Sequence, residues 1–399
     1  FSVIIVGALL AASTGVVGAT VITMGLISLP AMLRAGYCPK MATGAIGASS
    51  TLAQIIPPST VLIFIGDLLA GVNQSAQLRL GNFAPDPISV GDLFAGALIP
   101  GFILVGLFLL WTIYKAVFQP ETVPAILMTP EERKGLPVRV VAVLIPPLIL
   151  IVAVLGSILF GFATPTESAS VGAIGAMLLA AANRKLSFAT IRYAALNTMI
   201  TTSIIFTIVL AASLFSLVFR GLGGEHMVEQ ALHNLPGGAF GAMLAVMAIM
   251  FILGFFLDTF EIILIMLPIC GPPLILLGLD PLWIGVMVAM NLQTSFMTPP
   301  FGFTLFYLRG VAPPKVATAQ IWAGAFPFVV LQLMGLALLW SFPSTATWLP
   351  KKLFGPAAIE QSAPAGASTG GFGEFIQDDS FQLDDEGMPL EVDDPFSKR

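Results

Sequence analysis

Long stretches of the sequence contain no charged residue, and at least six of them are long enough to cross a membrane. A helix needs about 20 consecutive apolar residues to span the hydrocarbon core of a bilayer. Hydrophobic residues make up 57% of the chain and charged residues only 10%, whereas an ordinary soluble domain has about 25% charged residues. The sequence therefore predicts an all-α polytopic membrane protein, with uncharged runs at 1–33, 140–166, 193–219, 235–257, 281–308 and 316–350.

The net charge of −5 is concentrated in the last part of the chain. Residues 351–399 carry most of the acidic excess and are rich in Gly, Ser, Pro, Asp and Glu, so we expect a disordered acidic tail. The first 350 residues are nearly neutral. They contain no basic patch with interleaved aromatic residues, so nothing favours a nucleic-acid partner.

Two Pro-Pro pairs, Pro57-Pro58 and Pro299-Pro300, stand in matching hydrophobic frames 242 positions apart. Each pair has a further proline 18 positions upstream, Pro39 or Pro281. Proline ends a helix because it lacks an amide proton and clashes with the preceding turn. Helix breaks at corresponding places in two halves of a membrane protein point to the binding site of a secondary transporter.

The shared frame predicts a repeat architecture with two re-entrant helical hairpins. We expect a first repeat at 1–118 with its hairpin at 41–71, and a second at 140–350 with its hairpin at 281–312. Between them, 119–139 is a basic linker, which the positive-inside rule places in the cytoplasm. The register carried back to Phe1 predicts further helices upstream of that residue. Glycines at 15, 18 and 25 predict a kink or break within 1–33. The polar stretch 72–92 is predicted to form an extramembrane loop.

Uncharged polar residues surround both predicted breaks. Neither 41–66 nor 281–308 contains a charged residue, so an anionic substrate would meet helix ends, hydroxyl groups and bound cations there. Oxygen ligands of this kind suit a hard cation such as sodium. The candidate substrate-binding residues are Ser49, Ser50, Thr51, Ser59, Asn291, Thr294, Ser295, Thr298 and Gly302.

Asp258 and Glu261 are acidic residues within an apolar stretch, where ionisable groups are costly and are functional candidates. In the repeat register Asp258 corresponds to Thr20, so we expect it to ligate a cation or else to serve as a packing acid. Glu261 is expected to line an interface or meet another subunit. The candidate sodium ligands are Ser50, Pro57, Asp258, Thr259, Thr298 and Pro299.

Three other motifs have plainer explanations. Thr164 and Glu167 fit a helix-capping box. His226 and His233, with two neighbouring glutamates, suit an amphipathic segment at the membrane surface better than a metal site. Cys38 and Cys270 form no disulfide or metal pattern.

The segments GASSTLAQIIPPS, GFATPTESASVGA, FFLDT and GLDPLWIGVMVAMNLQTSFMTPPFG resemble the large membrane subunit of TRAP (tripartite ATP-independent periplasmic) transporters, over roughly residues 1–342. The resemblance implies an inverted-repeat, elevator-type transporter in the bacterial inner membrane, with sodium as the coupling ion and no other cofactor. It also implies that a periplasmic substrate-binding protein delivers a small organic carboxylate and that a small membrane subunit braces the scaffold. It places the sodium and substrate sites at 49–60, 291–304 and Asp258.

Three alternatives differ in mechanism. A stand-alone sodium/carboxylate symporter of similar hairpin architecture would need no binding protein. An intramembrane enzyme would need a nucleophile with its base or paired aspartates, and the sequence has neither H-E-x-x-H nor G-x-S-x-G. A passive channel would not explain helix breaks in both halves.

Overall fold

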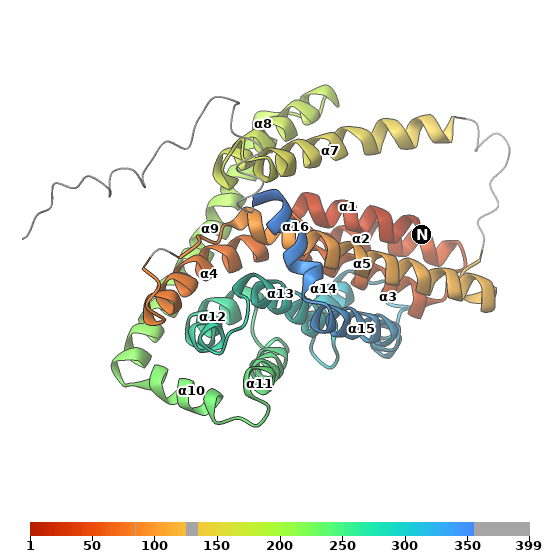
Figure 1. The fold of residues 1–399 in the computed structure, drawn as a ribbon. Helices are drawn as coiled ribbons and strands as arrows, with labels where there is room; N and C mark the ends of the chain where they lie inside the picture. Colours follow the sequence, from red (N-terminus) through yellow and green to blue (C-terminus); the bar gives the residue numbers. More distant parts are fainter. Residues whose placement is uncertain (84, 125–134, 355–399) are drawn as a thin grey trace, which may run out of the picture. The chain divides into compact units, whose positions relative to one another are not determined.

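The computed structural model describes residues 1–83, 85–124 and 135–354, with only the backbone described at 136–139. These residues form helices joined by short turns, and none of them forms a β-strand (Figure 1). Within the described ranges, seven helices are long and apolar enough to span a bilayer. The prediction of an all-α polytopic membrane protein is confirmed.

The first half of the chain contains a broken helix followed by a hairpin and a long span. The break is at Gly15, whose φ of +63° lies in the left-handed region that glycine adopts at little cost. The predicted interruption of 1–33 is therefore confirmed at the first of the three glycines. The elements are α1 (Ser2–Thr14), α2 (Val17–Arg34), α3 (Pro39–Thr51), the 3₁₀ turn η1 (Leu52–Gln54), α4 (Thr60–Arg79) and α5 (Val90–Phe118).

The middle of the chain forms long helices with little protein around them. The predicted capping box begins α8: the Thr164 amide donates to the Glu167 carboxylate at 2.8 Å, and the Glu167 amide donates to the Thr164 hydroxyl at 3.3 Å. The elements are η2 (Pro120–Thr122), α7 (Leu136–Leu159), α8 (Pro165–Ala182), α9 (Phe188–Gly221) and α10 (Gly224–His233). The linker residues 125–134 lie outside the described part of the chain.

The second half repeats the plan of the first. A helix break precedes a proline-marked hairpin, and a long span follows it. The elements are α11 (Gly238–Leu253), α12 (Thr259–Leu276), α13 (Pro281–Met297), α14 (Phe303–Val311), α15 (Thr318–Ser341) and α16 (Ser344–Phe354).

Three predicted boundaries change. The stretch 72–92 is not a continuous loop, because α4 continues to Arg79 and α5 begins at Val90. Ser89 starts α5 with a capping box to Asp92, which the sequence analysis overlooked. The first hairpin therefore extends beyond 41–71. Residues 351–354, assigned to the disordered tail, belong to α16, and the remainder of that tail lies outside the described residues.

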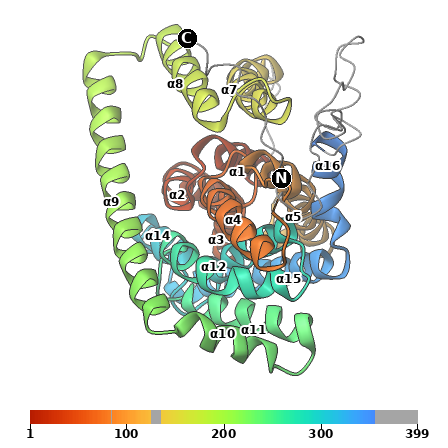
Figure 2. The ribbon, with the colours of Figure 1, turned by 60° about the vertical axis from the view of Figure 1, so that its left-hand side comes forward.

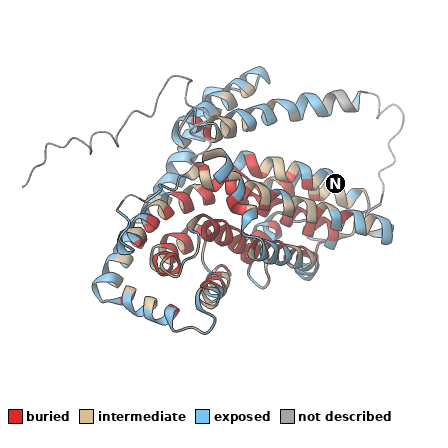
Figure 3. Ribbon diagram, in the orientation of Figure 1, coloured by how far each residue is buried: buried red, intermediate tan, exposed pale blue. Residues whose placement is uncertain are grey.

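The two halves interlock within residues 1–353, which form one compact unit. The second arm of each hairpin packs on the broken helix of the other half, α4 on α12 and α14 on α2 (Figure 2). Helix α15 packs along α3 and also contacts α13. Burial is densest in these hairpin and crossing helices, whereas α7, α8 and α9 are largely exposed (Figure 3). The interlocking buries most of the first proline break and the end of α13 that leads into the second, whereas Pro300 and Phe301 remain exposed.

Candidate functional site

The first proline break joins α3 to α4 through buried backbone. Pro39 occupies the first turn of α3, where a missing amide proton costs nothing. The helix ends in η1, and α4 begins after Ser59, whose hydroxyl accepts from the Leu62 amide at 3.5 Å. The same hydroxyl donates to the Gln54 carbonyl at 2.9 Å, across the break. Ser59 therefore fixes both sides of this turn.

The second break joins α13 to α14 in a corresponding way. Asp280 caps α13 by accepting from the Leu282 and Trp283 amides at 2.9 and 3.2 Å, and Pro281 occupies the first turn. After Met297 the chain becomes extended at Thr298. As at the first pair, the Pro-Pro bond here is cis.

Backbone carbonyls crowd together at the second break. A Cβ added to Gly302 would lie 2.8 Å from the carbonyl oxygens of both Phe296 and Thr298. Carbonyls at a helix C-terminus have no partner within their own helix and carry a partial negative charge. These two oxygens are chemically suited to a cation, and they converge close to Gly302.

The predicted site residues are almost entirely buried. The most enclosed of them, each 2% exposed or less, are Ser49, Ser50, Thr51, Ser59, Thr259, Asn291, Thr294 and Ser295. Pro57 and Gly302 are buried, and Thr298, Pro299 and Asp258 are partly exposed. Polar groups this deeply enclosed must be satisfied locally.

Most of these hydroxyl groups donate to their own helices. Ser50 donates to the Ile46 carbonyl at 2.7 Å, Thr294 to Met290 at 2.8 Å and Thr298 to the carbonyl of Thr294 at 2.7 Å. A hydroxyl that has placed its proton in this way keeps lone pairs free on the oxygen. Such an oxygen is an acceptor, which suits a cation or a hydrogen-bond donor.

A hydrogen bond joins the two hairpins directly. The Gln293 side-chain amide donates to the Thr51 hydroxyl at 3.4 Å, and both side chains are fully buried. Thr51 and Gln293 occupy equivalent positions, each six residues before its Pro-Pro pair. The Gln332 amide donates to the same hydroxyl at 2.9 Å.

Asp258 and Thr259 lie beside the first hairpin. The Gln54 side-chain amide donates to the Thr259 hydroxyl at 3.2 Å. Within the described chain, no hydrogen bond links this segment to Thr298 or Pro299. Of the predicted sodium ligands, Thr259 is tied to the first hairpin by this bond, and Thr298 and Pro299 lie at the second break.

Asp258 is the residue before α12, and this position gives Glu261 a structural role at the start of the helix. The Glu261 carboxylate accepts from the Asp258 amide at 3.2 Å, as in a capping box. The sequence predicts that Glu261 lines an interface or meets another subunit, and the structure shows in addition that it caps the helix. The Asp-x-x-Glu spacing was the signal that could have revealed this role.

Glycines let the broken helices approach the hairpins. The Thr60 hydroxyl donates to the Gly15 carbonyl at 2.7 Å, so the break between α1 and α2 lies against the first hairpin. A Cβ at Gly254 would collide with the side chain of Ser295. Each hairpin thus packs against a second irregular segment, and backbone polar groups gather at both places.

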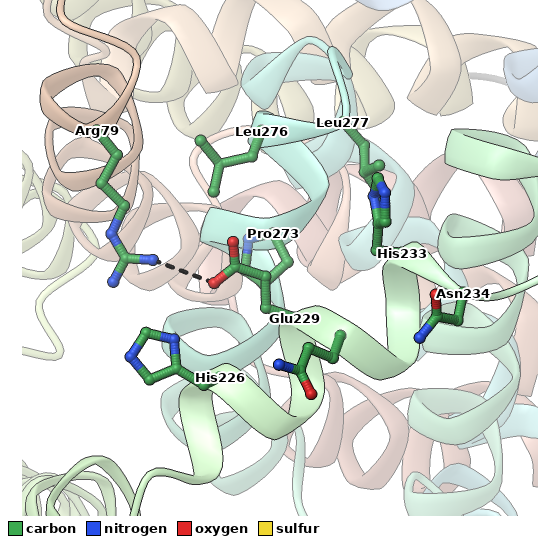
Figure 4. A pocket seen from close by; sticks show the side chains of 9 residues that line it. Arg79, His226, Glu229, His233, Asn234, Pro273, Leu276 and Leu277 are labelled. Atoms are coloured by element: carbon green, nitrogen blue, oxygen red, sulfur yellow. Dashed lines mark ion pairs between the residues drawn. The ribbon is translucent and has the colours of Figure 1, made fainter.

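The segment with the two histidines lies away from these breaks. His226 and His233 are exposed on α10 and line a cavity of about 600 Å³ (Figure 4). Arg79 of α4 pairs there with Glu225 and, at 3.5 Å, with Glu229. Among the described residues no group of three His, Cys, Asp or Glu side chains is placed to hold a metal ion. This arrangement favours the amphipathic surface helix over the metal site.

Gln332 is the main polar residue of the core that the sequence analysis missed. It lies in α15, in the apolar segment FVVLQLMG, and is fully buried. An amide in the middle of a charge-free span was the available signal, because polar residues within membrane helices are costly and pair across helices.

Comparison with known proteins identifies the family. Residues 2–345 match the family described as "Tripartite ATP-independent periplasmic transporter, DctM component". The C4-dicarboxylate TRAP transporter large permease protein DctM of Rhodobacter capsulatus is 28% identical over 358 residues, covering 88% of this chain and 78% of that protein.

Other relatives carry different substrate names at similar identity. The ectoine TRAP transporter large permease protein TeaC of Halomonas elongata is 28% identical over 342 residues, 86% of this chain and 74% of that protein. The 2,3-diketo-L-gulonate TRAP transporter large permease protein YiaN of Escherichia coli is 26% identical over 348 residues, 86% of this chain and 75% of that protein. These relatives are transport proteins rather than enzymes, and the apolar spans fit a multi-pass protein of the bacterial inner membrane. The chain belongs to the DctM component family of tripartite ATP-independent periplasmic transporters.

Proposed function

We propose that this chain imports a small organic carboxylate, such as a dicarboxylate or sugar acid, and that an inward sodium gradient drives the import. The observation that carries the proposal is the buried hydrogen bond between Thr51 and Gln293, which joins the two uncharged helices that lead into the proline breaks. Relatives named for C4-dicarboxylates and for 2,3-diketo-L-gulonate support the substrate class.

Sodium would bind to the Asp258 carboxylate and to neutral hydroxyl and carbonyl oxygens near the two breaks. Asp258 and Thr259 supply one group beside the first hairpin, together with Ser50 and Pro57. Thr298 and Pro299 supply the other. A bound cation would offset the negative charge of a carboxylate in a site without Arg or Lys, which explains why substrate and sodium would bind together.

Movement is the second part of the proposal. The hairpins and their crossing helices would move as an elevator against a scaffold that includes α7, α8 and α9. The exposed apolar faces of that scaffold suit lipid and a small membrane subunit. A periplasmic substrate-binding protein would deliver the substrate.

Uptake into proteoliposomes tests the proposal. The chain would be reconstituted with the small membrane subunit, and accumulation of a labelled C4-dicarboxylate would be measured with and without the loaded binding protein. Accumulation should require both an inward sodium gradient and the binding protein. Equal accumulation with potassium replacing sodium would contradict sodium coupling, and uptake without the soluble protein would favour the stand-alone symporter.

A further inference from the structure

Helix α15 approaches the first hairpin unusually closely. A Cβ at Gly324 would lie 2.9 Å from the carbonyl carbon of Lys40, and one at Gly44 would lie 2.7 Å from the carbonyl carbon of Gly324. Only two glycines facing each other permit this distance between the α3 and α15 backbones. Gln332 lies eight positions after Gly324, on the same face of the helix. The close approach therefore brings its amide to Thr51.

The Thr51 hydroxyl uses its whole hydrogen-bonding capacity at this point. It donates to the Ala48 carbonyl at 2.9 Å and accepts from Gln332 at 2.9 Å and Gln293 at 3.4 Å. A hydroxyl has one proton and two lone pairs, so no further bond is available to it. All three polar side chains have 0% exposure. Among the described residues the Thr51 hydroxyl is fully bonded, whereas the Oε1 atoms of Gln293 and Gln332 have no hydrogen-bond partner. A hydrogen bond in such an enclosed place is costly to lose.

Three helices from distant parts of the sequence meet at this hydroxyl. Thr51 belongs to the first hairpin, Gln293 to the second and Gln332 to α15. Thr51 and Gln293 occupy equivalent positions of the two halves, each six residues before its Pro-Pro pair. Helix α15 is also bonded to the second hairpin elsewhere, where the Trp283 indole donates to the Leu339 carbonyl at 3.1 Å.

We propose that Gln332 is a positioning residue that fastens both hairpins into one body through Thr51. With its amide in place, α15 holds the first hairpin directly and the second through the shared hydroxyl and Trp283. Without it, Thr51 keeps the bond to Ala48 of its own helix and, between helices, only the longer bond to Gln293, and the two breaks lose their fixed separation. This inference deepens the proposed function, since substrate and sodium would bind at those breaks, but its test requires neither transport nor sodium.

The test measures the distance between the hairpins in the full chain in liposomes. Cys38 and Cys270 are replaced by Ser and Ala, and spin labels are attached at Asp67→Cys of α4 and Phe306→Cys of α14. Both labelled positions are exposed. Pulsed electron–electron double resonance then gives the distribution of distances. We compare Gln332→Met, which keeps the side-chain length but removes the amide, with Thr51→Val and with both together.

The matched control is Gln320→Met, the same substitution on the same helix. Gln320 accepts from the Ala317 amide at the start of α15 and lies outside the cluster. We expect one narrow distance in the parent and the control, and loss of that single distance in Gln332→Met. Thr51→Val should show the same loss, and the double variant should be no broader than the broader single variant.

Two results would overturn the inference. One is an unchanged narrow distance in Gln332→Met. The other is equal broadening in Gln320→Met, which would indicate general loosening of α15. If Gln332→Met does not fold, Thr51→Val decides, with Thr112→Val as its control, because the buried Thr112 hydroxyl bonds only its own helix at Phe108. Failure of sodium-driven uptake would leave the distance result standing, so the two proposals fail separately.

Discussion

The hairpin core, α1–α5 with α11–α15, and the segment α7–α9 are both strongly apolar, yet they bury different shares of their helices. In the most apolar window of α12, 61% of residues are buried, compared with 6% in the windows of α7 and α9. Apolar composition places both in a membrane. Among the described residues, the core encloses nearly all of the buried polar side chains, whereas α7–α9 bury one, Ser168, which pairs with Ser157. We therefore place the proposed site in the core.

Replacing a glycine by leucine should show the largest difference in stability between the two regions. Replacing Gly324 by Leu places a side chain against the Lys40 backbone, which cannot move without separating α3 from α15. We expect destabilisation by about 3 kcal/mol, the upper end of overpacking costs. The apparent melting temperature in detergent, followed by gel filtration, measures it. The control is Gly221→Leu at the end of α9, where an added Cβ would meet no described atom within 4 Å outside the adjoining backbone; this variant should melt like the parent. Equal losses would show that α9 is as tightly packed as the core.

A buried amide in the core should matter more than a hydroxyl on α9. The Asn291 side chain donates to the Met247 carbonyl at 2.9 Å and joins α13 to α11. Asn291→Ala should cost about 2 kcal/mol, because a buried hydrogen bond is lost and a space remains. Ser203→Ala removes an exposed hydroxyl that bonds its own helix at Met199 and should cost almost nothing. Similar melting temperatures for the two variants would show that a buried polar group of the core contributes no more to stability than an exposed one on α9.

Asp258→Asn tests whether this carboxylate binds sodium, as distinct from the effect of removing any acidic side chain. We expect the sodium concentration for half-maximal uptake to rise about tenfold, equivalent to about 1.4 kcal/mol of lost binding. Asp67→Asn changes an exposed acid on α4 and should leave that concentration unchanged. Membrane insertion of both variants is checked by the yield of monodisperse protein. An unchanged sodium requirement in Asp258→Asn would remove this residue from the site.

The smallest effect is expected where the core meets α10. Arg79 pairs with Glu225 and Glu229 through side chains that are partly exposed (Figure 4). Surface ion pairs contribute little, so Arg79→Gln should cost about 0.5 kcal/mol. The difference in melting temperature should shrink when salt is raised to about 1 M, because salt screens exposed charges. A large effect that persists in high salt would show that this contact is part of the core.

Much of the core could be predicted from sequence because its signals are local. Pro57-Pro58 and Pro299-Pro300 located both breaks because each pair stands among polar residues in a repeated frame. A Pro-Pro pair alone does not end a helix here, since Pro146-Pro147 lies within α7 and Pro272-Pro273 within α12. Gly15 marked the broken first helix. The repeat frame also placed Thr51 and Gln293 at equivalent positions, although it did not predict their hydrogen bond.

What escaped prediction depends on contacts between distant segments. Gln332 meets Thr51 across 281 positions, and only the packing of Gly44 on Gly324 makes that contact possible. The low burial of α7–α9 was equally hidden, since an apolar helix has the same composition beside lipid as beside protein. Arg79 escaped as well, because its partners on α10 lie far along the chain.

Hydrogen–deuterium exchange with and without sodium is the most direct test of the claim that the hairpin breaks bind the coupling ion. The protein would be held in nanodiscs, and amide exchange compared between sodium and an equal concentration of potassium. We predict that sodium slows exchange at 49–60, 258–262 and 291–304 and leaves 140–221 unchanged. Protection that is absent at both breaks, or equally strong across α7–α9, would contradict the account.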